Sequence, residues 1–99
     1  VSRPYLGIKY RFISREVAIL NKVPQGAYIQ EVLANGPAAK AGIKAGDIIT
    51  QINSQTIDAE NKIAEIIAKA NIGQHLELTA WRGGKEIKLT AILIESTSE

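Results

Sequence analysis

Two alternating runs separated by a pair of glycines constrain the fold of this chain more than any other feature. From His75 to Trp81, and again from Lys85 to Ala91, polar and apolar residues alternate, as they do in strands that are buried on one face only. Gly83 and Gly84 lie between the runs and suit a tight turn. The C-terminal part of the chain is therefore predicted to form a β-hairpin.

Similar local signals divide the rest of the chain into short elements. Further strands are expected at Tyr5–Tyr10, from Gly26 to the turn at Asn35–Pro37, at Asp47–Ile52 and at Thr56–Ile57. Helices are expected from the N-cap Ser14 to Leu20, over Ala38–Ala41 before Gly42, and over Glu60–Asn71. Five or six short strands with two or three helices predict a small α+β domain or a partly open barrel.

The 99 residues suffice for one domain, and the chain is 45% hydrophobic and 22% charged, as in ordinary globular proteins. Cysteine is absent, which excludes disulfides and thiolate metal sites. Because the chain begins at Val1 without a methionine, we interpret it as a piece of a longer protein. Residues 95–99 are polar and are expected to form a fringe.

The composition and spacing argue against nucleic-acid binding and against catalysis. Twelve basic residues stand against ten acidic ones, they are dispersed, and aromatic residues do not alternate with them. His75 is the only histidine, and a solvated strand residue is its simpler interpretation. Gly36, Gly42 and Gly46 miss the spacing of a phosphate-binding loop, and Asp47 would repel a phosphate. We expect no catalytic residue, metal or cofactor in this fragment.

One segment of the sequence indicates a way to bind a ligand. In Tyr5-Leu6-Gly7-Ile8 a glycine stands between large apolar residues at the start of a strand. Glycine can adopt backbone angles that turn successive N–H groups into one anion-binding concavity. If the following strand is an exposed edge, an extended peptide could join it and place its terminal carboxylate there. The alternative is that Gly7 only lets the strand bend.

The chain also resembles a known family. The stretch Gly36–Ile49, followed by Ile52-Asn53, is similar to the signature of bacterial-type PDZ domains, which occur in HtrA/Deg serine proteases, site-2 metalloproteases and C-terminal processing peptidases. Arg3–Ile8 and Trp81–Lys85 resemble the domain that follows the trypsin-like domain of HtrA/Deg proteases. Ser54 and Ile72 replace a glycine and a proline that are usual in the family, both in turns away from the Gly7 segment.

The resemblance implies a permuted PDZ fold in which the strand that carries Gly7 comes first and a peptide lies between this strand and the long helix. On a helical wheel Ile66 stands at the edge of the apolar sector, so we expect it to be the main pocket wall, whereas Ile67 and Ala70 are expected in the core. The expected peptide-binding residues are Tyr5, Leu6, Gly7, Ile8, Lys9, Tyr10, Lys62, Ile63 and Ile66.

The implied function is recognition of hydrophobic C-termini of misfolded or cleaved proteins, for substrate recognition or activation of an upstream Ser-His-Asp protease domain in the parent chain. The resemblance also implies a location outside the bacterial cytoplasm, in the periplasm or cell envelope, or in a bacterial-derived organelle. Neither nucleic acid nor membrane is an expected partner. The alternatives are a structural or assembly PDZ domain with an occluded groove, a PDZ domain of a site-2 or C-terminal processing protease, and an enzyme fragment to which His75 contributes.

Overall fold

The computed structural model describes residues 3–34 and 36–96, with residues 3–5 and 94–96 described by their backbone alone. These ranges contain three helices and eight strands. Their order is β1 (Arg3–Tyr5), β2 (Ile8–Ile13), α1 (Arg15–Asn21), β3 (Gly26–Val32), α2 (Pro37–Ala41), β4 (Ile48–Ile52), β5 (Gln55–Thr56), α3 (Lys62–Lys69), β6 (His75–Arg82), β7 (Lys85–Ile92) and β8 (Ile94–Ser96).

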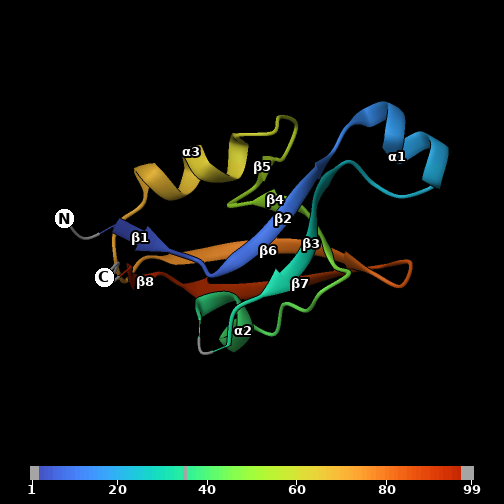
Figure 1. Ribbon diagram of the computed structural model, residues 1–99. Coiled ribbons are helices and arrows are strands. Elements are labelled where there is room, and N and C mark those ends of the chain that lie inside the picture. The colour runs from blue at the N-terminus through green and yellow to red at the C-terminus, as the bar shows by residue number, and fades with distance from the viewer. Residues whose placement is uncertain (1–2, 35, 97–99) are drawn as a thin grey trace.

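The strands form one large antiparallel sheet and one small one. The large sheet has the order β2-β3-β4-β6-β7, with β5 paired to β4, while β1 and β8 form a separate two-stranded sheet. Figure 1 shows α3 above β1, α2 on the opposite side of the molecule, and α1 projecting at the far end of β2 and β3. The predicted α+β class, with five or six strands in a partly open arrangement and two or three helices, is confirmed: six strands form the open sheet, and β1 and β8 are additional.

Isoleucine and leucine side chains fill the space between the sheet and the helices. Alternation along β6 buries Leu76 and Leu78 and leaves His75 and Glu77 exposed, as expected for a strand with one covered face. Helix α3 contributes Ile63 to the same cluster. The other large apolar residues that are exposed by 1% or less are Ile29, Ile49, Ile52, Ile57 and Leu93.

The predicted hairpin and the helix boundaries follow local chemistry. In the hairpin of β6 and β7, His75 pairs with Ile92 and Arg82 with Lys85. Ser14 caps α1, where its hydroxyl oxygen accepts the N–H of Val17 at 3.4 Å. Helix α2 starts with Pro37 at its first position and ends at Gly42, which has the left-handed φ of 98°.

Helix α3 is shorter than predicted. It covers Lys62–Lys69, whereas the sequence pattern indicated Glu60–Asn71. At its C-terminal end Ala70 is already extended, with φ −84° and ψ 165°. The chain turns there toward β6, and the N–H of Gly73 bonds to the carbonyl of Leu93 at 2.8 Å. Tertiary pairing therefore ends the helix before its apolar periodicity does.

Two other expectations need correction. The predicted strand Tyr5–Tyr10 is interrupted at Leu6 and Gly7, which divide it into β1 and β2. Residues 95 and 96, expected in a polar fringe, belong to β8, whose Ser96 lies opposite Arg3. Residues 97–99 of that fringe lie outside the described residues. Pairing with β1, a partner far away in sequence, orders a segment that has no strand pattern of its own.

Among the residues that the structure describes, no helix is long and apolar enough to cross a bilayer.

Candidate functional site

The loop between β1 and β2 is held in place by its carbonyl groups. The carbonyl of Leu6 accepts the N–H of Ala38, and that of Gly7 accepts the N–H of Leu33, both at 3.0 Å. Gly7 has φ 79°, a conformation that favours glycine. Gly36 packs closely on the loop, since a Cβ at position 36 would lie 3.5 Å from the Cα of Gly7. The start of α2 therefore fixes the loop from behind.

The N–H groups of this loop are left available. Outside strand pairing, and within the part of the chain that the structure describes, neither Leu6 nor Gly7 donates a backbone hydrogen bond. Ile8 lies opposite Val32 in the ladder. Since the carbonyl of Gly7 points to β3, the alternation of an antiparallel ladder turns the N–H and C=O of Ile8 away from β3. Neighbouring unpaired N–H groups of this kind suit an anion.

Strand β2 is an edge of the large sheet. Its register against β3 shifts between Lys9 and Tyr10, so that Tyr10 lies opposite Ile29. Ile29 uses its own N–H and C=O on the other side, toward Asp47 and Gly46, both at 2.8 Å. The backbone groups of Tyr10, like those of Ile8, therefore face away from β3. In residues 3–34 and 36–96 no strand pairs with this outer edge, and β8 pairs with β1 instead.

A hollow of about 370 Å³ lies beside this edge. Its lining comes from three consecutive β2 residues, Tyr10, Arg11 and Phe12, and from Glu60, which stands just before α3. Burial raises the pKa of the Tyr10 hydroxyl, and the negative charge of Glu60 raises it further. This hollow therefore lies between β2 and the turn that precedes α3, and we call it the groove along β2.

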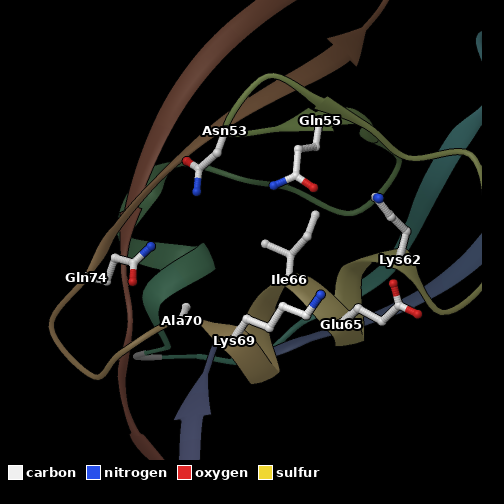
Figure 2. A pocket seen from close by; sticks show the side chains of 8 residues that line it. All are labelled: Asn53, Gln55, Lys62, Glu65, Ile66, Lys69, Ala70 and Gln74. Carbon is white, nitrogen blue, oxygen red and sulfur yellow. The ribbon is translucent and has the colours of Figure 1, made fainter.

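The opposite side of α3 borders a different hollow. Figure 2 shows Ile66 at its base, with Asn53 and Gln55 from the β4–β5 region facing it and Lys62 on its rim. This pocket has a volume of about 210 Å³, and no residue of β2 lines it. A helical wheel finds the apolar sector but not which neighbour each edge of the sector faces. A role of Lys62 and Ile66 in peptide binding stays a prediction of the sequence.

The remaining sequence-predicted site residues have varied positions. Ile63 is 1% exposed and belongs to the core. Leu6 is buried as well, and Ile8 packs on the same cluster while staying partly exposed. Lys9 is exposed and forms an ion pair with Glu31 across the strands at 3.3 Å. The side chain of Tyr5 lies outside the described residues.

An ion pair between a buried carboxylate and a partly exposed guanidinium, which the sequence analysis missed, fixes a second loop. Asp47 is 2% exposed, and its carboxylate accepts bonds from Arg82 Nε at 2.8 Å and Nη2 at 2.6 Å, and from the N–H of Lys44 at 3.0 Å. Arg82 also bonds to the carbonyl of Gly42 at 2.8 Å. Burial alone would raise the pKa of Asp47, but the bonds and charges of Arg82 and Lys44 outweigh it and leave this pKa below its ordinary value.

The groups considered for catalysis and metal binding are dispersed. His75 is exposed at the start of β6, opposite Ile92. Across the described ranges, no three or more His, Cys, Asp or Glu side chains are grouped so that they could hold a metal ion.

Comparison with known proteins identifies the family of this domain. The model of the PDZ domain family matches residues 4–93, and the chain belongs to this family. Within it, the chain is similar to the PDZ domains of HtrA/Deg serine proteases. A probable periplasmic serine endoprotease DegP-like of Halomonas elongata is 37% identical over 93 residues, which is 91% of this chain and 19% of that protein.

Solved structures lead to the same group. The HtrA-type protease AlgW, determined with a decapeptide, matches with a TM-score of 0.85 and 26% identity over 100% of this chain and 31% of its own. The HtrA3 PDZ domain bound to a phage-derived ligand (FGRWV) matches with a TM-score of 0.83 and 25% identity, covering 97% of this chain and 89% of its own. The chain spans about a fifth of the curated relatives, which are named periplasmic, in agreement with the compartment expected from the sequence.

Proposed function

We propose that this domain binds the C-terminal segment of a polypeptide along β2 and holds its terminal carboxylate at the Leu6–Gly7 loop. The observation that carries the proposal is the loop itself, whose carbonyls are bonded inward to Ala38 and Leu33 while its N–H groups are left over. The carboxylate would accept charge-assisted bonds from the N–H groups of Leu6, Gly7 and Ile8.

The peptide backbone would extend the sheet at its free edge. Ile8 and Tyr10 turn their backbone groups away from β3, so a peptide strand antiparallel to β2 can bond to both residues. Such bonds are independent of the peptide side chains and supply general affinity. Closure of the edge by the C-terminal strand of the domain is disfavoured, because β8 pairs with β1 rather than with β2.

We assign the helix wall of the groove to Ile67 in preference to Ile66. Ile66 lines the pocket that no residue of β2 borders, and Ile67, the next residue of the helix, is turned about 100° away from it. Ile67 is partly buried and packs on the same apolar cluster as Ile8.

The last peptide side chain would lie between Ile8 and Ile67 and gain about 1.5–3 kcal/mol from burial if it is Val- or Leu-sized. Since ordering the peptide offsets part of this gain, we expect affinity in the micromolar range.

For the parent protein we propose a serine endoprotease of the HtrA type outside the bacterial cytoplasm. Its curated relatives are periplasmic serine endoproteases, and the chain spans only about a fifth of them. The fragment would serve as its non-catalytic recognition module, which presents hydrophobic C-termini of misfolded or cleaved proteins to the protease domain or uses them to activate it.

The experiment is a calorimetric titration of the domain with two peptides of the same sequence that end in a hydrophobic residue, one with a free and one with an amidated C-terminus. We expect amidation to weaken binding about tenfold or more, because hydrogen bonds to a charged group contribute about 1.5–3 kcal/mol. Equal affinity for both peptides would rule out capture of the carboxylate.

Two variants test the helix wall with the free peptide. Ile67→Ala should weaken binding, whereas Lys69→Ala, on the other side of α3, should leave the affinity unchanged. If Lys69→Ala weakens binding and Ile67→Ala does not, the groove lies on the Ile66 side after all. Circular dichroism of both variants verifies that the fold is intact.

A further inference from the structure

The pocket on the far side of α3 is a second candidate site, independent of the groove along β2. Its base is apolar, since Ile66 is 8% exposed there and Ala70 lies next to it. Its rim carries Lys62 and Lys69, and Figure 2 shows both side chains along the same side of the helix. An apolar base beneath cationic groups suits a ligand with a short aliphatic part and a negative charge.

The side-chain amides of Asn53 and Gln74, on the rim of the pocket, can act as hydrogen-bond donors. The side-chain oxygen of Asn53 accepts the N–H of Glu77 at 2.9 Å, and that of Gln74 accepts the N–H of Asn71 at 3.0 Å. These bonds use the oxygen of each amide and leave its NH₂ group to the pocket. In Figure 2 both amide nitrogens point into the space between Asn53 and Gln74, beside Ile66. A ligand group placed between them meets these two donors.

The charges on the rim favour an anion. Two lysines, Lys62 and Lys69, stand against one carboxylate, Glu65, so the lining carries a net charge of +1. Within the described residues neither lysine forms an ion pair. Glu65 is turned to the start of the helix, where its Oε1 accepts a bond from Asn61 Nδ2 at 3.3 Å. The carboxylate that opposes an anion is thus partly engaged elsewhere.

We propose that this pocket binds an aliphatic carboxylate of the size of a glutamate side chain. Its methylene groups would cover Ile66 and Ala70, and its carboxylate would lie between the two lysines and the amide nitrogens of Asn53 and Gln74. The volume of about 210 Å³ accommodates one such side chain. A protein partner with an exposed glutamate and a free short-chain carboxylic acid share this chemistry.

The test titrates the ¹⁵N-labelled domain with two probes followed by NMR. One is a short alanine-based peptide with a central glutamate, acetylated and amidated at its ends, and the other is butyrate. The peptide has no free C-terminus and cannot use the Gly7 loop, so its failure would leave the proposed peptide function intact. We expect a dissociation constant on the order of 1 mM or weaker, with shifts at Ile66 and at the side-chain NH₂ signals of Asn53 and Gln74.

Matched controls decide the outcome. Replacing glutamate by glutamine in the peptide should abolish these shifts. Lys62→Gln and Lys69→Gln should each weaken binding about two- to fivefold, Glu65→Gln should strengthen it, and Lys85→Gln in the distant hairpin should change nothing. Binding of the peptide but not of butyrate identifies a protein partner as the source, and the reverse identifies a small acid. Absence of shifts with both probes, or equal shifts with the glutamine peptide, would overturn the proposal.

Discussion

Two loops of this domain are fixed by hydrogen bonds, but they differ in which of their polar groups remain without a hydrogen-bond partner. In the Gly42–Asp47 loop the buried carboxylate of Asp47 and the carbonyl of Gly42 both accept hydrogen bonds from the guanidinium of Arg82. In the Leu6–Gly7 loop only the carbonyls are bonded, and the N–H groups remain. The first loop therefore serves stability, and the second has the unpaired donors that a ligand requires. The difference arises from backbone direction and from one ion pair, not from sequence polarity.

The largest expected effect separates the two loops directly. Asp47→Ala removes three hydrogen bonds from a buried position and should lower the free energy of unfolding by about 2–3 kcal/mol, because Arg82 and the N–H of Lys44 lose a charged acceptor. Urea denaturation measures the change. Peptide affinity per folded molecule should stay near that of the wild type. A stable variant with much weaker peptide binding would show that the two loops are not separate in function.

Acid should weaken the Gly42–Asp47 loop at the pH at which Asp47 takes up a proton. The pKa of Asp47 is lower in the folded protein than in the unfolded chain, so the folded state binds fewer protons and protonation favours unfolding. The stability that Asp47 contributes is fully present above the unfolded pKa of about 3.9 and is lost as the pH falls through the lower folded value. The difference in stability between the wild type and Asp47→Asn should therefore shrink from pH 6 toward about pH 3. A difference that is independent of pH would contradict this assignment.

The smallest effect is expected at the ion pair that links β2 to β3. Lys9 and Glu31 are both mostly exposed, so Lys9→Ala should change the free energy of unfolding by about 0.5 kcal/mol or less, and less still at high salt. Thermal denaturation at low and high salt measures it. A loss comparable to that of Asp47→Ala would mean that exposed and buried pairs contribute alike here.

The features that were predictable from the sequence are those that neighbouring residues determine. The alternation of polar and apolar residues and the glycine pair at 83 and 84 predicted the hairpin of β6 and β7. Pro37 predicted the start of α2. The sequence did not predict contacts between distant segments. Asp47 and Arg82 are 35 positions apart, and nothing in either segment marks them as partners. The pairing of β1 with β8 was missed for the same reason.

The candidate site was predictable to a similar extent. A glycine between apolar residues indicated the Leu6–Gly7 loop, because its backbone requirement is local. The helix side was harder, since Ile66 and Ile67 are equally apolar and only the position of α3 relative to β2 and β5 decides which neighbour each one faces. Periodicity gives the width of an apolar sector but not its orientation in the fold.

The pairing of β1 with β8 brings the two ends of the described chain to the same place, as Figure 1 shows. Any polypeptide joined before Arg3 or after Ser96 would therefore connect to the domain through one small ribbon. Tyr5, the last residue of that ribbon, adjoins Leu6. A force or rotation that an attached domain applied to β1 would reach the Leu6–Gly7 loop through one peptide bond. Binding of a ligand at this loop would in turn restrain β1 and the domain attached to it.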